Sequence, residues 1–262
     1  MVGSAPARER LQSEIGSSTS KVGSRRSRSR AFFPRTAQRN VLNHRVISIG
    51  ALSTNELWPP EAEQPGAAHA TTVLVRSGGK NILVDPGLPG RVVTARLAER
   101  SGLRPPDIDV VFLTNFRPSH RRGLEAFPDA EWTLFEPERE AVGRALLARF
   151  QEEEDEANKR LLQEEINVLR RCTAATDALA PNVDLFPGPG FTPGTCGLLL
   201  IKPGRTVLVA GDTVPTQEHL ESGRVLRGCY DTAKAQESLV DAIEIADLIV
   251  CGHDNVVVSP GR

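Results

Sequence analysis

Residues 115–120 form a polar turn whose side chains include an imidazole, a guanidinium and a hydroxyl. The turn directly follows the apolar run 111–114, which predicts a buried strand that ends at Thr114. Side chains at the carboxyl end of a strand lie where α/β folds tend to place their sites. An imidazole such as that of His120 can bind a metal ion or transfer a proton there, so the sequence predicts a functional site at this turn.

Four further turns, each at the end of an expected strand, carry similar groups. They are residues 85–87 (Asp-Pro-Gly), 191–195 (Phe-Thr-Pro-Gly-Thr), 211–213 (Gly-Asp-Thr) and 251–253 (Cys-Gly-His). Together with residues 115–120, their order and spacing resemble the five motifs of the metallo-β-lactamase superfamily over residues 45–255. The resemblance implies an α/β fold, an αββα sandwich of two mixed β-sheets flanked by helices. It also implies a hydrolase whose two metal ions, usually zinc, activate a bridging water.

The first metal site of that family is replaced in this chain. The family's motif Thr-His-x-His-x-Asp-His falls on residues 114–120, and a third histidine follows a Thr-Pro-Gly turn. By the resemblance, the three ligands of the first ion correspond to Asn115, Arg117 and Thr195. None of these is a good zinc ligand, and arginine is a fixed cation that would repel the ion. We therefore expect the first site to be lost.

The second metal site is only damaged. The resemblance places its four ligands at Ser119, His120, Asp212 and His253, so three of the four side chains remain. Two histidines and one carboxylate can hold a single divalent ion with open positions. Asp85 matches the aspartate that supports the metal loop in this family through hydrogen bonds rather than by ligation.

These replacements favour a pseudoenzyme, a non-catalytic or metal-free homologue that acts as a binding or structural protein. In this hypothesis no cofactor is expected, and Arg117 replaces the metal charge by pairing with Asp212 or Asp85, because a buried carboxylate needs a partner. The cleft would then hold a small anionic molecule or an acidic side chain of a partner protein.

Two alternatives remain open. One is a weak hydrolase of an ester, thioester, lactone or phosphoester, with one zinc, manganese or iron ion bound by His120, Asp212 and His253. The other uses a thiol, Cys196 or Cys251, activated as a thiolate by a nearby arginine or histidine. Against it, a free cysteine is more commonly buried as a small hydrophobic residue.

The elements that must position these turns follow from apolar periodicity. Strands are expected at residues 45–51, 71–76, 81–85, 107–114, 132–135, 183–186, 198–202, 206–210 and 248–251, and helices at 91–101 and 232–246. Residues 136 to about 180 predict a helical insert, with two helices or one bent helix around the charged run 152–156. The insert could be a lid, an arm for homodimerisation, or a surface element packed on its own sheet.

The whole chain has 262 residues, of which 39% are hydrophobic and 25% charged, and a formal net charge of −1. This composition is typical of a soluble folded protein and gives no reason to expect nucleic acid to bind the chain as a whole. Residues 1–43 are basic and rich in Ser and Arg, so we expect a disordered arm, which could tether nucleic acid, before a folded domain at 44–262. The four cysteines include no Cys-x-x-Cys pair, and no run approaches the roughly 18 apolar residues that span a bilayer. We therefore expect a cytoplasmic protein with reduced thiols and no membrane partner.

Overall fold

A computed structural model describes residues 41–59, 61 and 66–261 of the chain. The expected basic arm at 1–43 lies almost entirely outside these residues, and its predicted disorder stays a prediction. Strand β1 (Asn43–Ser48) begins at the last position assigned to that arm.

The first sheet has six strands in the order β1-β2-β3-β4-β5-β6. Its strands are β1, β2 (Thr72–Ser77), β3 (Lys80–Val84), β4 (Val110–Leu113), β5 (Glu131–Leu134) and β6 (Thr173–Ala174). The hairpin between β2 and β3 turns at Gly78 and Gly79, whose φ angles of 57° and 85° are the left-handed values that a tight hairpin turn needs. From β3 onward the neighbouring strands pair in parallel, so their carboxyl ends meet at one edge of the sheet.

The second sheet also has six strands, in the order β12-β11-β10-β9-β8-β7. They are β7 (Ala178–Ala180), β8 (Val183–Pro187), β9 (Cys196–Lys202), β10 (Arg205–Gly211), β11 (Leu248–Cys251) and β12 (Val256–Val258). Only β10 and β11 pair in parallel, which places the turns that follow these two strands side by side. The short strands β6, β7 and β12 were not predicted from the sequence, because each has only two or three residues and no clear alternation.

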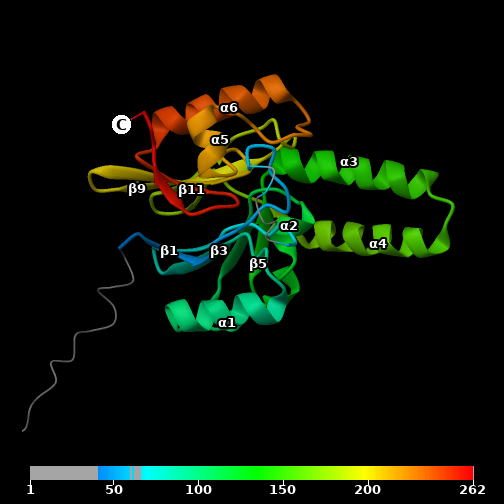
Figure 1. Ribbon diagram of the computed structural model, residues 1–262. Helices are drawn as coiled ribbons and strands as arrows, with labels where there is room; N and C mark the ends of the chain where they lie inside the picture. The colour runs from blue at the N-terminus through cyan, green and yellow to red at the C-terminus, as the bar shows by residue number, and fades with distance from the viewer. Residues whose placement is uncertain (1–40, 60, 62–65, 262) are drawn as a thin grey trace, which may run out of the picture. The chain divides into compact units, whose positions relative to one another are not determined.

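The two sheets pack face to face, and their inner side chains form one core cluster that includes Val84 and Phe112 of the first sheet and Leu198 and Val209 of the second. A second cluster lies under α1 (Gly90–Ser101) on the outer face of the first sheet, and a third lies under α6 (Thr232–Ile245) on the outer face of the second (Figure 1). The predicted αββα sandwich of the α/β class is therefore confirmed.

The predicted insert consists of two antiparallel helices, α3 (Glu136–Glu152) and α4 (Glu156–Arg171), which project from the sandwich as a hairpin (Figure 1). The charged run between them forms the turn, where the Asp155 side chain accepts hydrogen bonds from the backbone N–H groups of Ala157 and Asn158 in the first turn of α4. The prediction that the insert extends to about residue 180 is wrong, since residues 173–174 and 178–180 are strands of the two sheets. No helix among the described residues is both long enough and apolar enough to cross a membrane.

Candidate metal centre

Three turns from different strands bring the candidate ligands together. His120 lies in the short helix α2 (Pro118–Arg121), which follows β4. Asp212 follows β10 directly, and one residue separates His253 from the end of β11. Gly211 allows the end of β10 to approach the end of β4, because its φ of 55° suits glycine and a Cβ there would overlap the Thr114 side chain. The ends of β4 and β10 can therefore approach closely enough for side chains from both sheets to touch.

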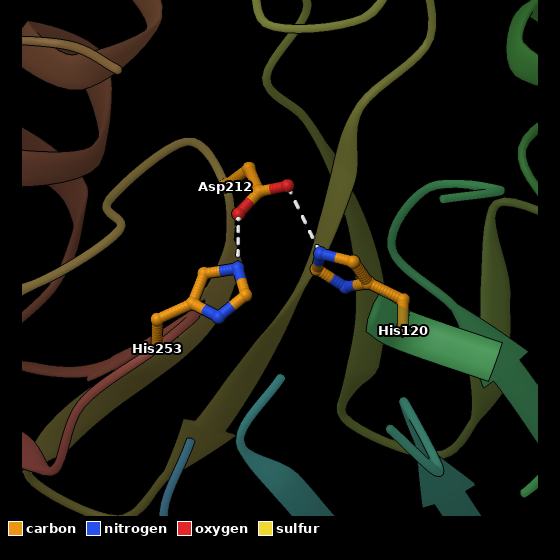
Figure 2. A group of neighbouring side chains, drawn as sticks. All are labelled: His120, Asp212 and His253. Atoms are coloured by element: carbon orange, nitrogen blue, oxygen red, sulfur yellow. Dashed lines mark hydrogen bonds and ion pairs between the residues drawn. The ribbon is translucent and has the colours of Figure 1, made fainter. Parts of the chain in front are cut away.

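The three side chains converge on one carboxylate (Figure 2). His120 Nε2 lies 2.9 Å from Asp212 Oδ2, and His253 Nε2 lies 2.9 Å from Asp212 Oδ1. All three residues are buried, and their ligand atoms lie within 4.8 Å of one another. Both histidines thus present the same ring nitrogen, Nε2, to the carboxylate between them.

The other ring nitrogen of each histidine is held by an acceptor. His120 Nδ1 lies 3.0 Å from Asp85 Oδ2, and the same carboxylate accepts the Thr114 backbone N–H at 2.9 Å and the Thr114 hydroxyl at 2.7 Å. His253 Nδ1 lies 3.0 Å from the backbone oxygen of His69. Acceptors behind Nδ1 favour the tautomer with its proton there, which leaves Nε2 with a lone pair. Asp85 therefore holds both His120 and Thr114 by hydrogen bonds.

This arrangement requires a positive charge, because two Nε2 lone pairs would otherwise face a buried carboxylate. Burial opposes a charged ring, but the Asp212 and Asp85 carboxylates outweigh it and raise the pKa of His120 to about 10. Burial likewise opposes an ionised Asp212, yet His120 and His253 hold the pKa of that carboxyl well below its usual range. Asp212 Oδ1 is buried and lies 2.9 Å from His253 Nε2, which can donate to it only when that nitrogen carries a proton. Either a proton on His120 or a divalent cation among these atoms can supply the charge.

The residues present fit a single divalent ion. Two imidazole nitrogens and a carboxylate oxygen form a donor set that several first-row metals accept, and both imidazoles have the supporting acceptors that metal-binding histidines usually show. With the proton of His253 on Nδ1, Asp212 Oδ1 faces a lone pair of Nε2 at 2.9 Å, and a cation would satisfy both atoms. Metal ligation by His120, Asp212 and His253 stays a prediction, but the structure does place the three together.

Asn115 and Thr195, two of the positions that the resemblance assigns to the first metal site, form hydrogen bonds within the protein. The Asn115 amide nitrogen donates to Asp212 Oδ2 at 2.8 Å, so it takes up one side of the carboxylate. The Thr195 hydroxyl accepts the Thr192 backbone N–H at 3.0 Å and lies 2.7 Å from the Thr192 hydroxyl. Asn115 and Thr195 thus have partners of their own. Ser119 is half-buried and lines the cavity beside the site without supplying a carboxylate.

Arg117 does not pair with Asp212 or Asp85, contrary to the first hypothesis. Its side chain is exposed, its guanidinium carbon lies 4.3 Å from the centre of the Phe191 ring, and no carboxylate in the described part of the chain forms an ion pair with it. Both carboxylates are already bonded to histidine, amide, hydroxyl or backbone groups. Arg117 therefore lies against Phe191 in the wall of the cavity beside the site and is not bonded to either carboxylate.

Replacing Arg117 with alanine is expected to change the free energy of unfolding by less than about 0.5 kcal/mol, as is usual at an exposed position with no buried partner. Chemical denaturation of the wild type and of Arg117→Ala measures this difference. A loss of several kcal/mol would show that Arg117 does neutralise a buried carboxylate in solution.

The thiol hypothesis also finds no support in the site. Cys196 and Cys251 are buried free thiols. Burial raises the pKa of Cys196 to about 12 and raises the pKa of Cys251 further, so the reactive thiolate is disfavoured at both positions. Cys196 packs in the core between the two sheets and Cys251 in the core under α6, where each acts as a small hydrophobic residue.

Two further buried residues beside the candidate site were not predicted from the sequence. His219, in α5 (Gln217–Ser222), is buried and lines a cavity of about 240 Å³ together with Asp212 and His253. Its Nδ1 lies 2.9 Å from the Thr216 hydroxyl, and burial lowers its pKa, which keeps the ring neutral. The Thr-x-x-His spacing is a helix-start pattern, but nothing in it indicates that this helix borders the site.

The second is Glu138, a buried carboxylate in the first turn of α3. Its two oxygens accept backbone N–H groups from Phe116 at 3.1 Å and from Gly194 at 3.0 Å. Glu138 thus links the turn at residues 115–120 to the turn at residues 191–195. A glutamate in the first turn of a helix is common, so the sequence alone did not single it out.

Comparisons with known proteins agree with the fold and with the motifs. A family model described as the metallo-beta-lactamase superfamily matches residues 65–253, which confirms the resemblance seen in the sequence. No curated protein is similar enough in sequence to count as a relative.

Several solved structures share the fold. A metallo-beta-lactamase candidate from Thermotoga maritima is 18% identical, with a TM-score of 0.62 over 84% of this chain and 100% of the other. A candidate metal-dependent hydrolase from Staphylococcus aureus is 15% identical, with a TM-score of 0.63 over 85% and 95% of the two chains. AidC, described as a dizinc quorum-quenching lactonase, is 18% identical, with a TM-score of 0.59 over 74% and 77%. At such low identity these likenesses establish the architecture alone.

Proposed function

Because the chain belongs to the metallo-beta-lactamase superfamily, whose model spans residues 65–253, we propose that it is a hydrolase that uses one divalent metal ion. His120, Asp212 and His253 would hold the ion, and zinc, manganese or iron are the candidates. This proposal reverses the preference drawn from the sequence, in which Arg117 supplied the missing charge.

One observation carries the proposal: both histidines have Nδ1 held by an acceptor and Nε2 turned toward Asp212, with each Nε2 2.9 Å from a different carboxylate oxygen. With its proton on Nδ1, neither ring can donate to the buried carboxylate, and a divalent cation would satisfy both Nε2 lone pairs and the carboxylate. When bound, a divalent ion supplies a Lewis acid and lowers the pKa of a bound water to about 7.

The surrounding residues would bind the substrate and handle protons. The cavity of about 240 Å³ that borders Asp212 and His253 also has Arg117 and Arg227 in its wall. An arginine at this place can hold the carboxylate that is released when an ester, thioester or lactone is hydrolysed. His219 lies in the same wall, and its lowered pKa keeps its ring in the neutral form, which can accept a proton.

A second candidate function is the metal-free binding protein. It is favoured by the raised pKa of His120, because a proton on that ring, between Asp85 and Asp212, also supplies the missing charge. The Asn115 amide adds a further donor to Asp212. In that state the network would be structural, and the cavity would bind a small anion or an acidic side chain of a partner through Arg117.

The two candidates are separated by an activity assay on protein purified without affinity metal and treated with a chelator. The substrates are p-nitrophenyl acetate, an N-acyl homoserine lactone, an acyl thioester and bis(p-nitrophenyl) phosphate, each with zinc, manganese or iron(II) added. We expect metal-dependent hydrolysis of at least one substrate, and its loss in both His120→Ala and His253→Ala.

The matched control is His44→Ala, because His44 is a partly buried histidine whose Nδ1 contacts Lys202 Nζ rather than the site. This variant should keep the wild-type activity. The proposed hydrolase would be contradicted if His120→Ala and His253→Ala both keep the activity. It would also be contradicted if no added metal restores activity to the chelator-treated wild type.

A further inference from the structure

A groove of about 1060 Å³ runs along the helical hairpin formed by α3 and α4. One end lies at Phe116 and Arg117, next to the candidate metal centre, and the other lies at Glu153 and Asn158, near the tip of the hairpin. Because α3 rises about 1.5 Å per residue, the stretch from Glu138 to Glu153 spans roughly 22 Å. The groove is therefore long and suits an elongated ligand.

The walls of the groove combine apolar side chains with charged ones. The apolar members include Ala141, Ala145 and Leu146 of α3 and Leu161 of α4. Leu161 is 60% exposed, and Tyr230, which also lines the groove, is 76% exposed. The two alanines leave the space open, since a larger side chain at either position would fill it. Exposed apolar side chains beside charged ones suit a ligand that has an apolar part and a charged part.

The charges that line the groove favour an anionic ligand. Arg121 is bonded to Glu165 and stacks on Phe116, so its charge is already balanced. Arg117 and Arg149 are exposed and form no ion pair with a carboxylate among the residues that the structure describes. Of these two, Arg117 also lines the cavity beside Asp212, whereas Arg149 lines the groove farther along α3. The head group is therefore assigned to Arg117, with its apolar part along the hairpin.

We propose that the groove between α3 and α4 binds the hydrocarbon chain of an acyl carboxylate, with the carboxylate held by Arg117. As a statement about substrate, this rests on the proposed hydrolase, since cleavage of an acyl ester, thioester or lactone beside Asp212 would release such a carboxylate next to Arg117. As a statement about binding, it requires neither a metal ion nor catalysis.

The test is calorimetric titration of dodecanoate, below its micelle concentration, into chelator-treated protein. We expect saturable one-to-one binding, with butyrate and the cationic dodecyltrimethylammonium each bound at least about tenfold more weakly, because the first lacks the chain and the second the anionic head. Equal binding of the cationic analogue would overturn the assignment of the carboxylate to Arg117.

Two matched pairs of variants locate the site. Ala145→Trp fills the groove and should weaken dodecanoate binding at least about tenfold, whereas Ala148→Trp, at an exposed alanine of α3 outside the groove, should leave it unchanged. Arg117→Ala should weaken binding about tenfold, whereas Arg122→Ala, at an exposed arginine outside the groove, should not. All four positions are exposed, so the variants should fold.

Unchanged binding in Ala145→Trp would overturn the proposal. A dimer seen by sedimentation would also overturn it, if dodecanoate does not dissociate the dimer and Ala145→Trp abolishes it. The groove would then be the contact surface for a second copy of the chain. If dodecanoate binds in this pattern but no substrate is hydrolysed, the proposed ligand of the groove is supported and the proposed hydrolase is contradicted. If metal-dependent hydrolysis occurs but dodecanoate does not bind, the hydrolase is supported and the proposed ligand of the groove is contradicted.

Discussion

Zinc or manganese added to chelator-treated protein is expected to raise its unfolding temperature, and His120→Ala and His253→Ala are each expected to abolish the increase. A ligand that binds only the folded state stabilises it by about 2.7 kcal/mol at a concentration one hundred times its Kd. For a domain of this size, each kcal/mol corresponds to roughly 2–4 °C, so the shift should be roughly 5–11 °C. The measurement is thermal unfolding with and without metal, together with metal analysis of the dialysed protein.

The control for this experiment is His44→Ala, which should keep the full shift because His44 lies outside the site. Manganese is the more informative ion, since zinc also binds the cysteines and histidines of the unfolded chain and so reduces the apparent stabilisation. An unfolding temperature that neither ion changes in the wild type would rule out the mononuclear site and favour the metal-free binding protein.

In the metal-free protein, the free energy of unfolding is expected to fall as the pH rises above about 6.5. The reason is His120, whose pKa of about 10 in the folded state exceeds its ordinary value of 6.5, because the attraction of Asp212 and Asp85 outweighs the effect of burial. Below pH 6.5 both states bind the proton and the stabilisation is complete. Above it only the folded state does, and the stabilisation is lost as the pH approaches 10. Each pKa unit corresponds to about 1.36 kcal/mol, so the full loss is a few kcal/mol.

Denaturant titrations between pH 6.5 and 8.5 measure this slope. The upper limit matters because the raised pKa values of the buried cysteines add a similar loss above about pH 8.5, where unfolded thiols ionise. His120→Gln should flatten the profile, and bound metal should flatten it in the wild type, since the ion then supplies the charge that the proton supplied. A wild-type profile without any slope in this range would show that His120 is neutral in the folded protein.

Together these two measurements show whether a proton or a metal ion neutralises the centre. The proton alone predicts a falling stability profile and no metal effect. The ion predicts a large shift that increases with pH, because a proton on His120 Nε2 competes with the metal for the same lone pair. The structure supports both states with the same three side chains, which is why activity and stability need to be measured on the same preparations.

The amino-acid sequence by itself determined the architecture and showed which residue types stand at the candidate metal centre. Apolar runs that end in polar turns depend on residues close together in the chain, so most strands, the β2–β3 hairpin and helices α1 and α6 were predicted near their observed positions. The prediction that the first metal site is lost also came from the sequence, because Asn115, Arg117 and Thr195 are poor zinc ligands whatever their surroundings.

Only the tertiary structure decided which groups touch. Asp212 reaches His120 because Gly211 lets β10 approach Thr114 of β4 across two sheets, which is a packing event between residues far apart in sequence. Arg117 contacts Phe191 instead of a carboxylate because Asp212 and Asp85 already have partners, and the contacts of a long side chain depend on such neighbours rather than on its own type. The same holds for His219 beside the cavity, for Glu138 between two turns and for the groove along α3 and α4, since each arises where elements that are separate in sequence come together in space.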